Sequence, residues 1–261
     1  MILNINSIEQ QANSSLIITG HRGAANLAPE NTLASIYKAL ETKANRIEID
    51  VRQSIDGRVV VIHDETVNRT TDGKGKVNEM TYSSIKTLDA GSWFSSDYSE
   101  ETIPSLEKVI QTFNPKKELI IEIKVDGNYN NSIEDNVIKI IKEYRATDYC
   151  IIQSFDTNVL RRIHELEPKI RLHKLIVGKF HFLPIYFGTE LEIINLKNYD
   201  FIDEISLHYY FANRKTVKNL KAFNKKVNAW TVDDYNKTQQ LYINGIDGVI
   251  TNNPNLMDIP N

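Results

Sequence analysis

Short apolar runs recur along the chain, and most are followed by longer stretches in which apolar residues return at helical spacing. Nine runs indicate strands, at Leu16–Thr19, Arg46–Val51, Val59–Ile62, Leu119–Ile123, Cys150–Phe155, Leu172–Val177, Phe201–Leu207, Val227–Val232 and Gly248–Thr251. The pattern predicts strands that alternate with helices, which is typical of a parallel sheet covered by helices.

The third run breaks this alternation. Only residues 52–58 separate Val51 from Val59, too few for the dozen-residue crossover that joins two parallel strands. The pair Asp56-Gly57 is typical of a β-hairpin turn. We therefore expect residues 59–63 to return antiparallel to residues 46–51. The eight remaining strands, each followed by room for a helix except the last, predict a (β/α)8 TIM barrel, whose functional groups lie at the carboxyl ends of the strands.

The chain between the second barrel strand and the helix expected near Pro104 lacks clear periodicity. Residues 64–102 are rich in Thr, Ser, Gly and Asp and include Trp93 and Phe94. A stretch of that length is better interpreted as a cap inserted over the barrel mouth than as a bare loop. The 261 residues then fit one barrel domain over residues 1–261, with an insertion at about 52–103.

Capping residues mark three helix starts. Residues 29–32, with the sequence Pro-Glu-Asn-Thr, precede an amphipathic stretch that runs through Leu40. Asp156-Thr157 and Asp233-Asp234 stand before two others. Such side chains accept hydrogen bonds from the free N–H groups of a first helical turn, so each predicts a helix N-terminus.

Composition indicates a soluble, intracellular protein, and we expect it in the cytoplasm. Apolar residues make up 41% and charged residues 25%, as in globular proteins. The net charge of −3 gives no support to a nucleic-acid or anionic-membrane partner. No apolar run reaches the ~18 residues of a transmembrane segment. The single cysteine, Cys150, excludes a disulfide framework and is expected to be a buried, small apolar residue. The oligomeric state is not predicted.

Acidic side chains occupy alternate positions on two neighbouring strands. Glu48 and Asp50 share one face of the second strand, and Glu122 and Lys124 share a face of the next barrel strand. Three carboxylates inside a barrel repel one another unless a cation lies between them. Oxygen ligands suit a hard divalent cation such as Mg²⁺ or Ca²⁺. The alternative is that Glu48 and Glu122 pair with Arg46 or Lys124.

Two histidines and an arginine are expected at the same rim. His21 and Arg22 end the first strand, and His63 ends the returning strand of the hairpin. Histidine transfers protons near neutral pH, and the arginine fork matches a phosphate group. Their shared position favours a functional role over a structural one for these two histidines. The structural interpretation is kept for His164, His173 and His181.

Eight ordered motifs resemble the glycerophosphodiester phosphodiesterase family over about residues 17–254. They are His21-Arg22-Gly23, Pro29-Glu30-Asn31-Thr32, Glu48-Ile49-Asp50-Val51, Val61-Ile62-His63-Asp64, Ile103-Pro104-Ser105-Leu106, Ile121-Glu122-Ile123-Lys124, Trp230-Thr231-Val232 and Gly245-Ile246-Asp247-Gly248. The resemblance implies a barrel with a small insertion after the second strand. It also implies hydrolysis of glycerophosphodiesters to glycerol 3-phosphate and an alcohol with one divalent cation.

Carried over motif by motif, the resemblance implies roles for eight residues. The metal ligands would be Glu48, Asp50 and Glu122, the acid–base pair His21 and His63, and the substrate-binding residues Arg22, Lys124 and Trp230. Which histidine is the base stays open. So does the attacking oxygen, which is either the glycerol 2-hydroxyl, giving a cyclic phosphate, or water.

Other functions are weighed against this one. A lysophospholipase D-like enzyme or a lyase acting on lysolipids would use the same barrel and release a cyclic phosphate. A catalytically silent barrel that binds a phosphate ligand or a protein could dispense with some of these residues, yet all are present. Aromatic residues in Lys179–Phe187 and His208–Phe211 could form an apolar wall for a lipid-like alcohol. Ordinary packing of these rings is the favoured interpretation.

Overall fold

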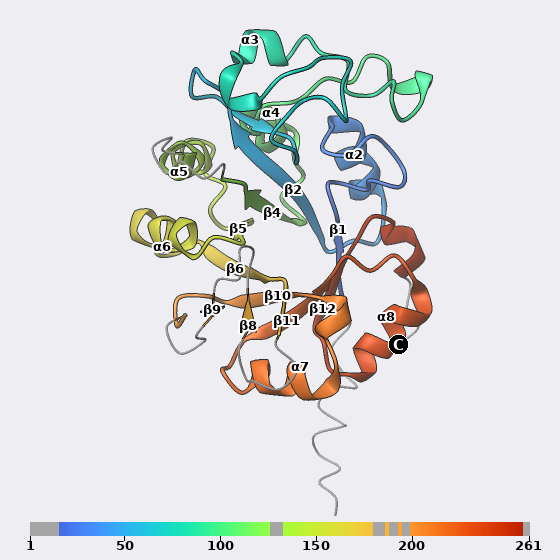
Figure 1. The fold of residues 1–261 in the computed structure, drawn as a ribbon, viewed down its shortest axis with the longest axis vertical. Helices are drawn as coiled ribbons and strands as arrows, with labels where there is room; N and C mark the ends of the chain where they lie inside the picture. Colours follow the sequence, from blue (N-terminus) through green and yellow to red (C-terminus); the bar gives the residue numbers. More distant parts are fainter. Residues whose placement is uncertain (1–15, 126–132, 180–185, 188–192, 195–198, 258–261) are drawn as a thin grey trace, which may run out of the picture.

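Eight parallel strands close into a barrel. The computed structural model, drawn in Figure 1, describes residues 16–125, 133–179, 186–187, 193–194 and 199–257. The barrel strands are β1 (Ile17–Gly20), β2 (Arg46–Gln53), β4 (Glu118–Ile123), β5 (Cys150–Ser154), β6 (Arg171–Ile176), β10 (Glu204–His208), β11 (Lys226–Trp230) and β12 (Gly248–Thr251). The strand order is β1-β12-β11-β10-β6-β5-β4-β2, and pairing of β1 with β2 closes the ring. The predicted (β/α)8 barrel is confirmed.

The predicted hairpin is also present. Strand β3 (Val59–Val61) runs antiparallel to β2, with Val51 opposite Val61 and Gln53 opposite Val59. The turn places Gly57 at a φ of +80°, in the left-handed region that glycine adopts without a steric cost. The hairpin therefore returns the chain along β2 and brings His63 back toward the acidic residues of that strand.

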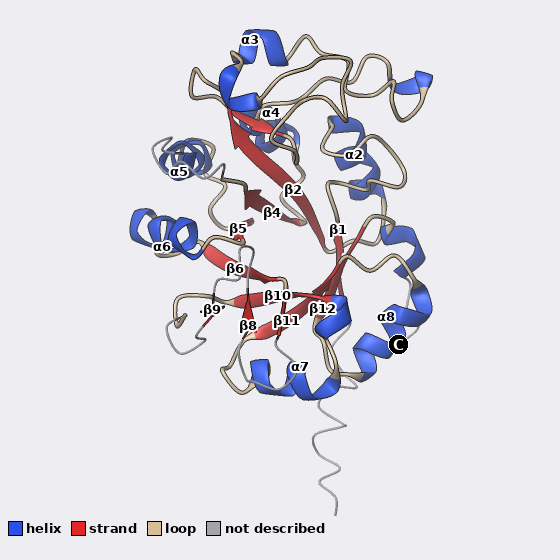
Figure 2. Ribbon diagram, in the orientation of Figure 1, coloured by secondary structure: helices blue, strands red, loops and turns tan. Residues whose placement is uncertain are grey.

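Helices lie outside the ring of strands (Figure 2). They are α2 (Leu33–Glu41), α4 (Leu106–Thr112), α5 (Ile133–Glu143), α6 (Thr157–Leu166), α7 (Arg214–Lys221) and α8 (Tyr235–Ile243), with η7 (Pro254–Met257) after the last strand. The three predicted starts are confirmed, because Thr32, Asp156 and Asp234 each accept a hydrogen bond from a backbone N–H of the first turn. Among the described residues, none of the helices combines the length and the hydropathy of a transmembrane segment.

The connection from β6 to β10 departs from the expected alternation. Its described residues include β7 (Gly178–Lys179), β8 (Tyr186–Phe187) and β9 (Ile193–Ile194), which pair in one antiparallel sheet. These residues satisfy backbone hydrogen bonds with neighbouring strands. The helix expected here is therefore not found among the described residues of this connection.

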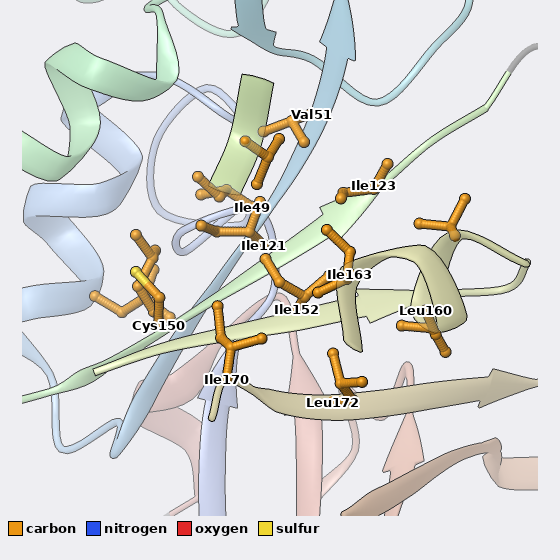
Figure 3. Packing of buried hydrophobic residues seen from close by; sticks show 14 of the residues in the cluster. Ile49, Val51, Ile121, Ile123, Cys150, Ile152, Leu160, Ile163, Ile170 and Leu172 are labelled. Atoms are coloured by element: carbon orange, nitrogen blue, oxygen red, sulfur yellow. The ribbon is translucent and has the colours of Figure 1, made fainter. Parts of the chain in front are cut away.

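Alternation along the strands separates the core from the barrel interior. Ile49, Ile121, Ile152 and Leu172 are register partners on four neighbouring strands, and all are buried. Figure 3 shows this row with Leu160 and Ile163 of α6 against it, and Cys150, fully buried as predicted, in the same cluster. The intervening residues of β2, such as Glu48 and Asp50, point to the opposite side, into the barrel.

The cap, residues 64–102, has a small core of its own. Val60 and Ile62 pack with Val67, Val77 and Ile85, whereas Val59 and Val61 belong to the main core. The two faces of one short segment thus hold the cap against the barrel. Most of the cap is loop, with η1 (Val77–Glu79), α3 (Tyr82–Ile85) and η2 (Ser96–Tyr98) as its short helices (Figure 2).

Candidate active site

Three buried carboxylates meet inside the barrel. Asp50 of β2 lies directly opposite Glu122 of β4, and Glu48 precedes Asp50 by two residues on the same face. One oxygen of each carboxylate lies within 4.8 Å of the others. The geometry therefore brings together the three residues that the sequence proposed as metal ligands.

The three carboxylates have opposing pKa shifts. Burial, followed by repulsion from Asp50, raises the pKa of Glu48 well above its usual value. Burial also raises the pKa of Glu122, to about 7. The pKa of Asp50 is lowered, because Lys124 and Arg22 outweigh the effect of burial. Burial and mutual repulsion thus oppose the ionisation of Glu48 and Glu122, while Asp50 is stabilised in its ionised form.

Pairing with Arg46 does not account for this cluster. Arg46 donates to both oxygens of Glu204, at 2.7 and 2.9 Å, and to Glu118 at 2.6 Å. Those carboxylates lie at the first residues of β10 and β4, toward the opposite end of the barrel from Glu122. The interpretation that Glu48 pairs with Arg46 is therefore wrong, whereas Lys124 does contact Glu122 and lies 3.1 Å from Asp50 Oδ1.

Neighbouring loops fix the orientation of two of the carboxylates. Asn31 Nδ2 donates to Asp50 Oδ2 at 2.9 Å, and Asn31 Oδ1 accepts from the Asp50 backbone N–H at 3.1 Å. The Arg22 backbone N–H donates to Glu48 Oε2 at 2.9 Å. Arg22 and Asn31 adopt φ angles of +51° and +59°, which are uncommon outside glycine. Such conformations are retained where the surrounding structure determines them, as at functional sites.

The carboxylate cluster fits a divalent cation. Glu48 Oε1, Asp50 Oδ1 and Glu122 Oε1 are all buried. Lys124 Nζ contacts the Asp50 and Glu122 oxygens, whereas no described donor reaches Glu48 Oε1. One ammonium group for three buried carboxylates leaves an acceptor unsatisfied, which is costly, so these oxygens are suited to metal coordination. An all-oxygen set matches the preference of Mg²⁺ and Ca²⁺.

His21 is held through its Nδ1 atom. Nδ1 lies 2.7 Å from Asn252 Oδ1, and Asn252 Nδ2 donates to Asp233 Oδ2 at 2.6 Å. Because an ionised carboxylate only accepts, Asp233 fixes the amide with its oxygen toward His21, so His21 Nδ1 carries the proton. Burial lowers the pKa of His21 to about 4, and the neutral ring presents an unprotonated Nε2.

His63 is held in the same way by a carboxylate. Its Nδ1 lies 2.7 Å from Asp64 Oδ1, and burial lowers the pKa of His63 as well. The charge of Asp50 acts on both imidazoles and on Arg22 and Lys124. The predicted catalytic and phosphate-contacting groups therefore lie around one aspartate, and the hydrogen bonds that hold the two histidines are made through Nδ1 of each ring.

Trp230 lies on another side of this region, at the end of β11. Its Nε1 donates to the Ser206 carbonyl at 2.8 Å, and its ring meets Phe155 edge-on at 5.4 Å between centroids. Lys124 Nζ lies 5.8 Å from the centre of the Phe155 ring. Trp230 is thus connected to the charged cluster through Phe155.

The two aromatic segments of the sequence analysis differ in what the structure describes. His208 packs against Tyr209 and Trp230, while Tyr210 is 72% exposed. Most of Lys179–Phe187 lies outside the described residues. The rings of His208 and Tyr209 thus contact other protein rings, in line with the interpretation as ordinary packing.

The model of the glycerophosphoryl diester phosphodiesterase family matches residues 21–256. This chain belongs to that family. A glycerophosphodiester phosphodiesterase of Caldanaerobacter subterraneus subsp. tengcongensis is 35% identical over 245 residues, covering 91% of this chain and 94% of the relative. One of Bacillus subtilis is 30% identical over 255 residues, with 92% and 85% covered.

A solved structure extends the comparison to three dimensions. An Oleispira antarctica phosphodiesterase in complex with the product sn-glycerol-3-phosphate has a TM-score of 0.82 and 29% identity, covering 92% of this chain and 94% of its own. The glycerophosphodiester phosphodiesterase of Thermotoga maritima has a TM-score of 0.70 and 27% identity, with 94% and 97% covered. The recognition of the glycerophosphodiester phosphodiesterase family from sequence motifs is confirmed.

Several residues that hold the site groups in this family member were assigned no role in the site from the sequence. Asn31 orients Asp50, and the pair Asp233 and Asn252 orients His21. Asp233 and Asn252 directly follow the seventh and eighth barrel runs, where a TIM barrel places functional groups, so their position was a usable signal. The role of Asn31 depends on its backbone conformation, for which the sequence offers no sign beyond a helix start.

Proposed function

We propose that this chain hydrolyses glycerophosphodiesters to sn-glycerol 3-phosphate and an alcohol, with one divalent cation and His21 and His63 as the acid–base pair. The observation that carries the proposal is the convergence of three buried carboxylates, two imidazoles and two cationic side chains around Asp50. Membership of the family and the product named in the Oleispira complex support the same substrate class.

The cation would be held by Glu48, Asp50 and Glu122. When bound, it would neutralise charge on the phosphate group and polarise an oxygen of the substrate. The three buried carboxylate oxygens within 4.8 Å of one another, with no described donor to Glu48 Oε1, support this assignment. Both Mg²⁺ and Ca²⁺ accept such oxygen ligands, so metal titrations must include both.

The protein's own side chains would bind the phosphate group and transfer the protons. Arg22 and Lys124 would bind the non-bridging phosphate oxygens, and positive charge placed in a site with little water stabilises the transition state strongly. One histidine Nε2 would accept the proton of the attacking oxygen, from the glycerol 2-hydroxyl or from water, and the other would protonate the departing alcohol. Each such transfer contributes about 10²–10⁴-fold. Trp230, beside Phe155, would line the substrate pocket.

The decisive experiment is an activity assay on the purified chain with glycerophosphocholine. Release of glycerol 3-phosphate is expected, with loss after chelation by EDTA and recovery with Mg²⁺ or Ca²⁺. His21→Ala and His63→Ala should abolish turnover and keep the wild-type melting temperature. His164→Ala, a histidine on α6 that stacks on Phe201, is the matched control and should stay active.

Three outcomes would count against the proposal. Full activity after exhaustive chelation would exclude the cation, and near-wild-type activity of either histidine variant would remove that residue from the acid–base pair. Accumulation of a cyclic phosphate, followed by ³¹P NMR, would identify the lyase instead of the hydrolase.

The cellular location and the single-domain organisation of the protein stay predictions. Cytoplasmic location rests on the sequence alone, and fractionation of cells that express the chain would test it. The single domain over residues 1–261 also stays a prediction, and one cooperative unfolding transition would support it.

A further inference from the structure

One arginine of the cap binds two carboxylates at once. Arg69 Nη1 and Nη2 donate to the two oxygens of Glu30, both at 2.8 Å. Its Nε and Nη2 donate to Asp64 at 2.7 and 3.0 Å. Four hydrogen bonds from a single planar guanidinium fix both carboxylates relative to each other, because the donors of arginine have a rigid geometry.

Each of these carboxylates continues to a group of the site. Glu30 Oε1 also accepts from Arg22 Nη1 at 2.6 Å, and Asp64 Oδ1 lies 2.7 Å from His63 Nδ1. A continuous series of contacts therefore runs from Arg22 through Glu30, Arg69 and Asp64 to His63. Arg22 follows β1, whereas His63 follows β3, so Arg69 connects groups from two separate strand ends.

Arg69 supplies the positive charge that lies between the carboxylates of Glu30 and Asp64. Without it, Glu30 and Asp64 would lie close together with no cation between them, and each would be free to turn toward its other partner. Arg22 is at present held between Glu30 and Asp50, whose Oδ2 is 3.4 Å from Arg22 Nε. These contacts use Nη1 and Nε of Arg22, which leaves Nη2 for a phosphate oxygen.

We propose that Arg69 is a positioning residue that sets the placement of Arg22 and His63 together, through Glu30 and Asp64, and so adapts the mouth to a bound phosphodiester. This inference rests on the proposed function. It gives the cap a chemical role, because Arg69 belongs to the inserted segment. Two of its hydrogen bonds reach Glu30 outside the cap, and two reach Asp64, the first residue of the cap, next to His63.

Arg69→Met and Arg69→Lys test the inference, with Arg162→Met as the matched control. Arg162 on α6 is 46% exposed, against 44% for Arg69, and also lies between two carboxylates, Asp135 at 2.8 Å and Glu165 at 3.7 Å. The measurements are kcat and KM with glycerophosphocholine, the Kd of sn-glycerol 3-phosphate by calorimetry, and Tm.

Arg69→Met should lower kcat/KM by at least about tenfold and weaken glycerol 3-phosphate binding, because displaced groups at a reacting centre cost activity steeply. Arg69→Lys keeps the charge without the fork and should fall between wild type and Arg69→Met. Arg162→Met should match the wild type. In Arg69→Met combined with Asp64→Asn, the two losses should not multiply, because both act through the same hydrogen bonds.

Arg69→Met with the kinetic constants and product affinity of Arg162→Met would overturn the inference. The inference would also be overturned if the losses of kcat/KM and of product affinity across the three variants were simply proportional to their falls in Tm. If Arg69→Met does not fold, Arg69→Lys decides by the same criteria. The wild type in the same assay distinguishes failure of the proposed function from failure of the positioning role. An inactive wild type overturns the proposed function. An active wild type with an unaffected Arg69→Lys overturns the positioning role alone.

Discussion

Glu122→Gln in the cation-free protein should increase stability, although it removes a functional group. The Glu122 side chain is buried beside Asp50, and its pKa is raised from 4.5 to about 7, first by burial. A carboxyl whose pKa is raised on folding stabilises the folded state only while it is protonated. Its contribution is complete below pH 4.5 and is lost as the pH rises through about 7.

The magnitude follows from the same shift. Each tenfold change in the acid dissociation constant corresponds to about 1.4 kcal/mol, so ionising Glu122 at pH 8 opposes folding by about 3 kcal/mol. Loss of the Lys124 contact offsets part of the gain, although Lys124 keeps Asp50 at 3.1 Å. We expect Glu122→Gln to exceed the wild type by about 1–3 kcal/mol at pH 8, with the difference shrinking toward pH 4.5.

Glu118→Gln provides the control on the same strand. Glu118 is bound by Arg46 and Arg171, which lower its pKa although burial acts to raise it. The same substitution there should destabilise the protein at pH 8. Urea unfolding in EDTA, followed by circular dichroism, measures both effects. A Glu122→Gln variant that is less stable than the wild type in EDTA at pH 8 would refute the reasoning. With excess Mg²⁺ or Ca²⁺, the wild type should become the more stable of the two, because only the wild type keeps all three ligands.

Three further substitutions test other parts of the structure. Arg46→Met should cost about 3–5 kcal/mol in the free energy of unfolding, because it removes the arginine that binds both oxygens of the buried Glu204; urea unfolding measures this. Asn31→Ala should lower cation affinity about 10–100-fold by freeing Asp50, measured by calorimetric titration, and unchanged affinity would contradict it. Asn252→Ala should lower kcat by up to about 10²-fold with little change in Tm, because His21 loses its orientation; a kcat equal to that of the wild type would show that Asn252 is not needed.

Much of the barrel could be predicted because its constraints are local. The seven residues between Val51 and Val59 cannot form a crossover, so the hairpin followed from chain length and the Asp56-Gly57 turn. Side chains alternate between the two faces of a strand, so the sequence alone also placed Glu48 and Asp50 on one face of β2.

The contacts that join distant segments could not be predicted in this way. Asn31 bonds Asp50 from a left-handed backbone conformation, and the Arg69 contacts join the packed cap to Glu30. The connection from β6 to β10 also differs, since its described residues form an antiparallel sheet where a helix was expected. Each of these depends on tertiary contacts and not on local periodicity.

Glutamate side chains at the two ends of the barrel interior affect folding in opposite ways when they ionise. At one end, Arg46 binds Glu118 and Glu204, and the pKa of each of these carboxyls is lowered, that of Glu204 to about 2, so their charge contributes to folding. At the other end, the pKa values of Glu48 and Glu122 are raised, so ionisation there opposes folding. A protein selected for stability alone would lack the second arrangement. Buried carboxylates that share a single lysine persist where a ligand supplies further positive charge, and that contrast within one barrel is the physical argument for a cation at the mouth.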